Sequence, residues 1–160
     1  MIHLENIDKM NEEQRLKYML ILLEGQISSE KDVLANLCNA SAIIMALVEK
    51  INWSGFYIMK ENELVLGPFQ GKPACNRVAV GNGVCGTAAS TKKIQRVQDV
   101  HEFPGHIACD SASNSEIVIP IIKDDNVFGV LDIDSPEKGR FTEMEEKYFS
   151  KFVKKIEKSL

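Results

Sequence analysis

Two apolar runs separated by a short polar turn constrain the fold of this chain more than any other feature. Residues 117–122 and 127–133 consist mainly of isoleucine, valine and leucine, and the sequence KDDN stands between them. Apolar runs of this length joined by a turn-prone tetrapeptide are typical of two antiparallel strands. We therefore predict a β-hairpin in this part of the chain.

Three segments have the spacing of apolar residues that an amphipathic helix requires, and they span residues 10–26, 33–48 and 141–160. Ser29 and Asp32 fit a capping box ahead of the second segment, and Thr142 and Glu145 fit one ahead of the third. Cys38 lies on the apolar face of the second segment, so we expect it to be a core residue.

Between these helices the sequence changes to short β-prone segments at residues 53–59, 64–66, 78–80 and 94–97. Residues 67–76 have the glycines and prolines of an irregular loop, residues 81–90 enter a short helix, and residues 99–114 form a long loop. This order of elements does not alternate as in a doubly wound parallel sheet. We predict one α+β domain over residues 1–160, with an antiparallel sheet packed by the N- and C-terminal helices.

The composition narrows the class of protein. A chain of 160 residues fits one domain, and its net charge of −4 gives no basic footprint for nucleic acid. The longest apolar-rich stretch, residues 40–48, is far shorter than the ~20 residues of a membrane helix. The N-terminal sequence MIHLENIDKMNEEQR has no hydrophobic export region. We therefore expect a cytoplasmic protein, whose four cysteines are buried or redox-active rather than permanently bridged.

Three carboxyl groups are predicted to meet at one end of the sheet. Residues two apart in a strand share a face, so Asp132 and Asp134 point the same way. A turn at residues 123–126 then places Glu116 almost opposite them. Like charges this close raise the pKa of at least one carboxyl, which can then act as a general acid near neutral pH. The alternative is that the three acids mark a solvated strand end.

Trp53 and Tyr57 are the aromatic candidates for a binding site. They are four residues apart on a predicted strand, so their side chains share a face. Two aromatic side chains on one face often belong to a core. They also form the kind of wall that receives an apolar or cationic ligand group, and the sequence leaves both interpretations open.

Three cysteines lie in segments where a thiol can react. Cys85 stands at the predicted start of a helix, where a thiol pKa is normally lowered. Cys75 and Cys109 lie in predicted loops, which can bring two sulfur atoms together and let them part again. His106 precedes Cys109 by three residues, so a cysteine–histidine nucleophile is conceivable. The long intervals between the cysteines argue against structural zinc, which normally uses CxxC pairs.

The glycine-rich sequence VGNGVCGTAAST, residues 80–91, suggests a binding site for an anion. It lacks the GK[ST] of a Walker motif and the dinucleotide-binding fingerprint. We interpret it as a tight turn into a helix whose backbone N–H groups can bind a phosphate or a substrate carboxylate.

Five segments of the chain are similar to the free methionine-R-sulfoxide reductases, which are single-domain enzymes with a GAF fold. These segments are NWSGFY, GPFQGKPAC, GNGVCGTAA, HIACDSASNSEIVIPI and GVLDIDSP, and the similarity extends from the first predicted helix to the last. The combination of three cysteines at matching intervals with aromatic and acidic positions is specific. A GAF module that only senses a ligand has no need for this set.

The resemblance implies roles for the thiols. Cys109 resembles the catalytic nucleophile and Cys75 the resolving cysteine that forms a disulfide with it. Cys85 resembles the third cysteine of the family, which can assist or substitute in resolution. Thioredoxin is the reductant that the resemblance implies, and no bound cofactor is needed.

The resemblance also implies a substrate, free L-methionine (R)-S-oxide. Trp53 and Tyr57 resemble the aromatic walls around its methyl group, and Glu116, Asp132 and Asp134 resemble the acids that hold and activate it. The residue chemistry agrees, because the sulfoxide oxygen is a poor leaving group until an acid protonates it. Thiolate attack then leaves a sulfenic acid, which a second thiol converts to a disulfide.

Two other functions are kept as alternative hypotheses. A GAF module that senses a small molecule and regulates a partner would not depend on the thiols. A thiol redox switch without a substrate would form a disulfide but would need neither Trp53 nor the acids. A homodimer is a common state of small domains of this kind.

Overall fold

Residues 7–106 and 110–160, which the computed structural model describes, form a six-stranded antiparallel sheet with helices on both faces. The strands are β1 (Trp53–Lys60), β2 (Glu63–Gln70), β3 (Arg77–Ala79), β4 (Gln95–Val97), β5 (Ser115–Lys123) and β6 (Asn126–Ser135), in the spatial order β3-β2-β1-β6-β5-β4. The helices are α1 (Glu12–Ser29), α2 (Val33–Leu47), α3 (Gly83–Thr91) and α4 (Glu143–Glu157), with short 3-10 turns at Ile7–Lys9 and Val100–Glu102.

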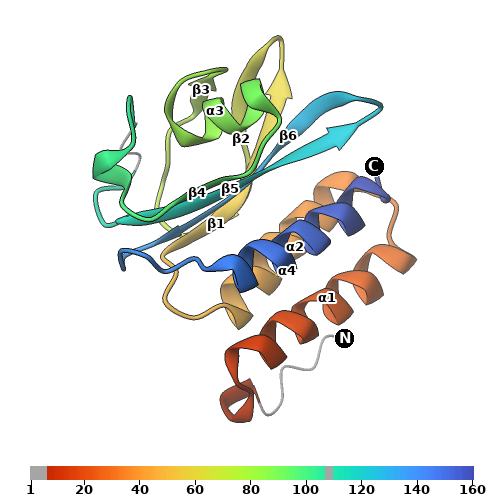
Figure 1. Ribbon diagram of the computed structural model, residues 1–160. Coiled ribbons are helices and arrows are strands. Elements are labelled where there is room, and N and C mark those ends of the chain that lie inside the picture. Colours follow the sequence, from red (N-terminus) through yellow and green to blue (C-terminus); the bar gives the residue numbers. More distant parts are fainter. Residues whose placement is uncertain (1–6, 107–109) are drawn as a thin grey trace.

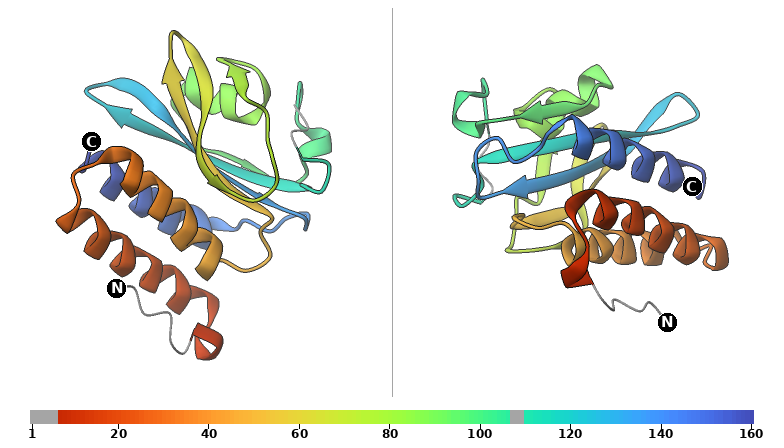
Figure 2. Two further views of the ribbon diagram at one scale, coloured as in Figure 1. Left: turned by 180° about the vertical axis from the view of Figure 1, so that it is seen from behind. Right: turned by 60° about the horizontal axis from the view of Figure 1, so that its bottom comes forward.

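The helices are divided unequally between the two faces of the sheet. Helices α2 and α4 pack on one face, and α1 packs against these two helices as an outer layer (Figure 1). Helix α3 lies on the opposite face, beside the short strand β3, as the view from behind also shows (Figure 2). The predicted α+β architecture is confirmed. No helix in the described residues has the length and apolarity that a membrane span requires.

The predicted hairpin is β5–β6, and its turn follows from two aspartates. Lys123 pairs with Asn126, and Asp124 and Asp125 between them have positive φ angles of 48° and 61°. Two consecutive left-handed residues make the tight turn whose twist matches that of the flanking strands, and aspartate tolerates this conformation better than most residues. The turn also fixes the register in which Glu116 pairs with Asp134.

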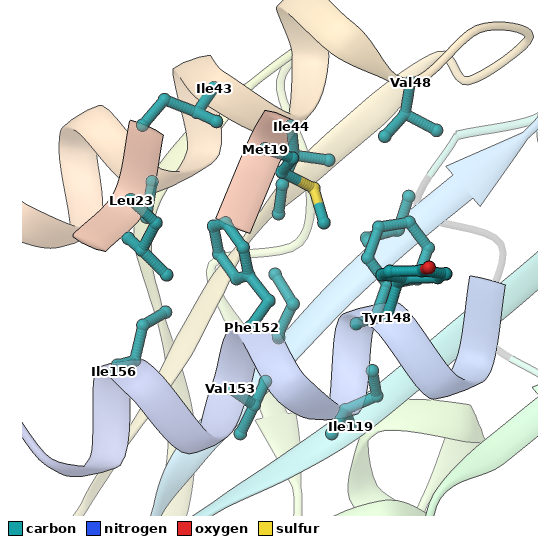
Figure 3. Close-up of a cluster of buried hydrophobic side chains, with 14 of the residues drawn as sticks. Met19, Leu23, Ile43, Ile44, Val48, Ile119, Tyr148, Phe152, Val153 and Ile156 are labelled. Carbon is teal, nitrogen blue, oxygen red and sulfur yellow. The ribbon is translucent and has the colours of Figure 1, made fainter. Parts of the chain in front are cut away.

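The main core lies between the sheet and the helical layer. Figure 3 shows how Met19 and Leu23 of α1, Ile43 and Ile44 of α2, and Phe152 of α4 gather there. The sheet contributes the residues of β5 and β6 that point to this side: Ile117, Ile119, Ile121, Leu131 and Ile133. Because side chains alternate along a strand, the residues between them face the opposite side.

Helix α2 differs from the prediction in two ways. Asp32 alone is its N-cap and accepts a hydrogen bond from Ala35 N at 2.8 Å, whereas Ser29 is the last residue of α1, so the predicted capping box is wrong. Cys38 is exposed rather than in the core, and so is Leu34, at 62%. The buried side of α2 is a stripe of other residues: Leu37, Ala40, Ser41, Ile44 and Leu47.

Strand β2 extends beyond its predicted end into the segment expected to be a loop. It continues to Gln70 and pairs with β1 across a shift in register between Gly55 and Tyr57. Pro68 fits into this strand because an irregular pair leaves a position where no ladder N–H is needed. The capping box of Thr142 with Glu145 at the start of α4 is confirmed.

A buried arginine joins the start of α4 to α1. The Arg140 side chain is 6% exposed, and its Nη1 lies 3.2 Å from Oε1 of Glu145, whose side chain is 1% exposed. Its Nη2 pairs with Glu12, and its Nε donates to the Glu49 carbonyl at 3.0 Å. The arginine therefore neutralises a carboxylate that has no access to water.

We expect Arg140→Ala to lower the free energy of unfolding by about 3 kcal/mol, because Glu145 would remain as a buried charge without its partner. Urea denaturation followed by Trp53 fluorescence measures this change. In the control variant Lys154→Ala, which removes an exposed ion pair with Glu157, the loss should stay below about 1 kcal/mol. Equal stabilities of the two variants would contradict the role assigned to Arg140.

Candidate active site

The β5–β6 hairpin brings the three predicted acids together on the face of the sheet that carries α3. Glu116 pairs directly with Asp134, and Val118 pairs with Asp132. Glu116 and Asp132 are each 6% exposed and Asp134 is half-buried, so the three acids do not form a solvated strand end. The register that the sequence predicted is confirmed to within one residue.

Burial gives these acids unusual proton affinities. It raises the pKa of Glu116 and of Asp134 well above the ordinary carboxyl values, and the neighbouring Asp132 charge raises both further. Burial also raises the pKa of Asp132, to about 6, although hydrogen bonds from Cys85 and Glu116 oppose the increase. Asp132 Oδ1 is buried and has no hydrogen-bond partner in the described part of the protein. The cluster therefore keeps protons bound at neutral pH, and Asp132 Oδ1 is free to accept a hydrogen bond.

Cys85 joins this acid cluster from the first turn of α3. The helix is brought close to the sheet by Gly86, where a Cβ atom would lie 2.3 Å from the Ala79 carbonyl oxygen. Cys85 Sγ lies 3.9 Å from Glu116 Oε1. Burial raises the pKa of the Cys85 thiol, and the nearby Asp132 raises it further. The lowered pKa expected from its place at a helix start is therefore wrong, because desolvation and negative neighbours outweigh the helix dipole.

Trp53 and Tyr57 form the wall of the site on β1. Their ring centroids are 6.0 Å apart with an interplanar angle of 25°, and the Phe69 ring also stacks on Trp53, at 5.3 Å between centroids. The polar groups of both side chains also donate hydrogen bonds to the backbone. Trp53 Nε1 donates to the Lys72 carbonyl at 3.1 Å, and the Tyr57 hydroxyl donates to the Cys75 carbonyl at 3.0 Å. The aromatic wall therefore anchors the segment that carries Cys75.

A single pocket unites these groups. The acids, Cys85 and the aromatic pair all line it, together with His106, Asp110 and Ser113 from the loop between β4 and β5. Nδ1 of His106 is buried without a hydrogen-bond partner, and burial lowers the pKa of the imidazole, so the ring is neutral at pH 7. Asp110 and Ser113 were not predicted, because nothing in a loop without periodicity indicates which side chains turn inwards.

The remaining cysteines differ in their state. Cys75 lies beside the pocket, packed against the apolar cluster around Trp53, and is disulfide-bonded, whereas Cys38 and Cys85 are free thiols. Cys109, the predicted nucleophile, lies outside the described residues. The structure therefore places Cys85 in the pocket wall and Cys75 against the apolar cluster next to it.

The start of α3 offers backbone donors to the pocket. Gly83 and Val84 line the pocket, and Asn82, which precedes them, makes no side-chain capping hydrogen bond within the described chain. The first N–H groups of a helix have no partner inside the helix and carry partial positive charge, so they can bind an anion. The site thus has donors for a negative group and acids for a positive one.

Three ligand atoms in the site are close enough together to hold a metal ion. The Cys85 sulfur and carboxyl oxygens of Glu116 and Asp132 lie within 4.8 Å of one another. All three groups hold their protons more tightly than usual, so a metal ion would have to displace those protons. The arrangement suits a proton-donating site that accepts an organic cation.

Comparison with known proteins shows one family. The GAF domain model matches residues 32–160. The free methionine-R-sulfoxide reductase of Escherichia coli (strain K12) is 52% identical over 134 residues, which are 84% of this chain and 81% of that protein. The enzyme of the same name from Saccharomyces cerevisiae is 44% identical, over 98% of this chain and 92% of that one. The structure of the free methionine-R-sulfoxide reductase from Neisseria meningitidis in complex with its substrate superposes with a TM-score of 0.91 at 37% identity, covering 99% and 94% of the two chains.

The buried Asp132 should make stability depend on pH. Its pKa is 3.8 in an unfolded chain and about 6 in the native protein, so between these values the native state binds more protons. The free energy of unfolding should therefore fall as pH rises through this window, by at most about 1.4 kcal/mol per pH unit from this group. Asp132→Asn has no proton to release and should show a shallower fall. Urea denaturation at several pH values compares the two proteins, and parallel curves would contradict the assignment.

Proposed function

We propose that this chain, which belongs to the free methionine-R-sulfoxide reductases of the GAF-domain family, reduces free L-methionine (R)-S-oxide to L-methionine. The observation that carries the proposal is a pocket lined by three acids, two of them buried, and by the aromatic wall. Sulfoxide reduction needs a proton for the oxygen, and burial keeps protons on this cluster at neutral pH. A sensor module would have no use for stored protons of this kind.

The free amino acid fits the polar groups of the pocket. Its α-ammonium can donate to Asp132 Oδ1, the buried oxygen that lacks a partner among the described residues. Its α-carboxylate suits the N–H groups at the start of α3, near Gly83 and Val84. Its methyl group suits the wall of Trp53 and Tyr57. A methionine within a polypeptide has neither free charge, so these contacts favour the free amino acid.

The thiol of Cys109 attacks the sulfoxide sulfur as a thiolate. An acid of the cluster protonates the oxygen, which passes to the cysteine, so that methionine leaves and Cys109 becomes a sulfenic acid. Cys75 then displaces water from the sulfenic acid and forms a disulfide. The disulfide-bonded state of Cys75 supports this resolving role. A dithiol protein, thioredoxin, reduces this disulfide and resets the enzyme.

Cys85 belongs to the acid cluster in this proposal. Its raised pKa makes it a poor nucleophile at neutral pH, since the thiolate is the reactive form. Its place beside Glu116 suits proton storage better than disulfide exchange. Cys75 therefore resolves the sulfenic acid, and Cys85 can substitute only if the α3 turn opens.

The setting of the enzyme is proposed on the same basis. Residues 1–160 act as a single GAF domain that works without a bound cofactor. The proposed location is the cytoplasm, where thiols are kept reduced and thioredoxin can act. A homodimer is the proposed assembly.

The test is a coupled assay with thioredoxin, thioredoxin reductase and NADPH. The wild-type chain should oxidise NADPH with free methionine-(R)-sulfoxide but not with the S epimer or a peptide sulfoxide. Cys109→Ser should abolish turnover because no nucleophile remains, and Asp134→Asn should slow it by about a hundredfold, the typical contribution of a general acid. Full activity of Cys109→Ser would exclude the mechanism. Full activity of Asp134→Asn would contradict its role as the general acid.

Tyr57→Phe separates the two roles of the aromatic wall. The ring remains for the substrate, but the hydroxyl that holds the Cys75 carbonyl is lost. KM should stay nearly constant, while disulfide formation after a single turnover should slow about fivefold, the value of one neutral hydrogen bond. Rapid quenching with thiol counting measures the step.

The matched control is Tyr148→Phe, which removes a hydroxyl that donates to Glu13 at 2.8 Å in the helical layer. This variant should close its disulfide at the wild-type rate. A large rise in KM for Tyr57→Phe with unchanged disulfide formation would contradict the anchoring role.

A further inference from the structure

A series of hydrogen bonds connects the residue after Cys109 to the acid cluster. Asn52, just before β1, donates from Nδ2 to Asp110 Oδ2 and to Ser113 Oγ, each at 3.1 Å. Ser113 in turn donates to Asp134. Asn52 is therefore the donor at the centre of the series, with Asp110 on one side and Ser113 on the other.

The second oxygen of Asp110 reaches the segment that carries Cys75. Asp110 Oδ1 accepts from Ala112 N at 2.9 Å, which closes a local turn, and lies 4.0 Å from Lys72 Nζ. The Asp110 side chain is 11% exposed although it is charged. The carbonyl of Lys72 is the group that Trp53 holds. Asp110 therefore contacts both loops on which the proposed chemistry depends.

Asn52 shows that this arrangement has a cost in stability. A carboxylate only accepts hydrogen bonds, so the amide nitrogen of Asn52 must face Asp110. The amide oxygen then points away, and it is buried with no hydrogen-bond partner in the described part of the chain. A buried acceptor without a partner is unfavourable, and it persists here because both amide hydrogens are used on the loop.

We propose that Asp110 is a positioning residue that holds the chain beside Cys109 against Asn52 and Lys72. The inference rests on the function proposed above, in which Cys109 must reach first the substrate and then Cys75. In this proposal Asp110 acts through its neighbour in the chain and not on the reacting atoms themselves. It reduces the range of positions open to its neighbour, and misplacement of a reacting group by about 1 Å can cost a hundredfold in rate.

The experiment is a double-mutant cycle with Asp110→Ala, Asn52→Ala and the double variant. Single-turnover methionine formation should fall about tenfold in each single variant, with KM changed less than about threefold, because the substrate contacts remain. The double variant should be no slower than the slower single variant, because both residues act through one hydrogen bond.

The matched control is Asp99→Ala. Asp99 also accepts from a backbone N–H two residues ahead, that of His101 at 3.0 Å, and pairs with a lysine, Lys138, but it does not line the pocket. This variant should keep the rate of single-turnover methionine formation, and the rate of disulfide formation described next, within about twofold of wild type. A change of that size is too small to reflect a lost hydrogen bond. If Asp110→Ala does not fold, Asp110→Asn replaces it, because the amide oxygen keeps the turn to Ala112 while the amide nitrogen opposes Asn52.

A second measurement needs no substrate. The reduced proteins are oxidised with diamide, and formation of the Cys75–Cys109 disulfide is followed by mass spectrometry. Slower closure in Asp110→Ala and Asn52→Ala than in Asp99→Ala would support the inference even if the wild-type chain reduced no sulfoxide. Wild-type rates of the Asp110 and Asn52 variants in both measurements would overturn it. A double variant whose loss of rate equals the product of the two single losses would also overturn it, as would a rise in KM without a loss of rate.

Discussion

The register of the β5–β6 hairpin is the constraint on which the rest of this structure depends. It pairs Glu116 with Asp134 and turns Ile117 and Ile133 to the opposite face, where α2 and α4 bury them. A slip by one residue would send the acids into the helical core and the isoleucines into the pocket. The same apolar packing that stabilises the fold therefore also sets the position of the acids.

Burial gives the site its chemistry. A carboxyl group in water is ionised at neutral pH, whereas the three acids are enclosed by the sheet, the aromatic wall of Trp53 and Tyr57, and helix α3. The first turn of α3 adds the protonated Cys85 thiol to the acid cluster and offers backbone N–H donors to the same pocket. One enclosure thus raises proton affinity and provides contacts for both charges of a free amino acid.

Two loops carry the proposed thiol chemistry. Hydrogen bonds from polar groups of buried or half-buried residues on and next to β1 hold these loops to the sheet. The Tyr57 hydroxyl and the Trp53 indole hold the backbone of the Cys75 segment, while Asn52 holds Asp110. Strand β1 and the residue before it therefore determine the positions of both loops. The aromatic wall and the residues that hold the loops come from the same stretch of chain. A substitution in one is therefore expected to affect the other.

The sequence by itself determined the hairpin, the α4 capping box, the shared face of Trp53 and Tyr57 and the meeting of the acids, because alternation and cap chemistry are local properties. Its family motifs pointed to the right family. Only the tertiary structure decided that Cys38 is exposed, because helical spacing does not say which side of α2 meets the sheet. It also decided that the Cys85 pKa is raised and that Asn52 holds Asp110, since desolvation and contacts between distant loops arise only when the chain is folded.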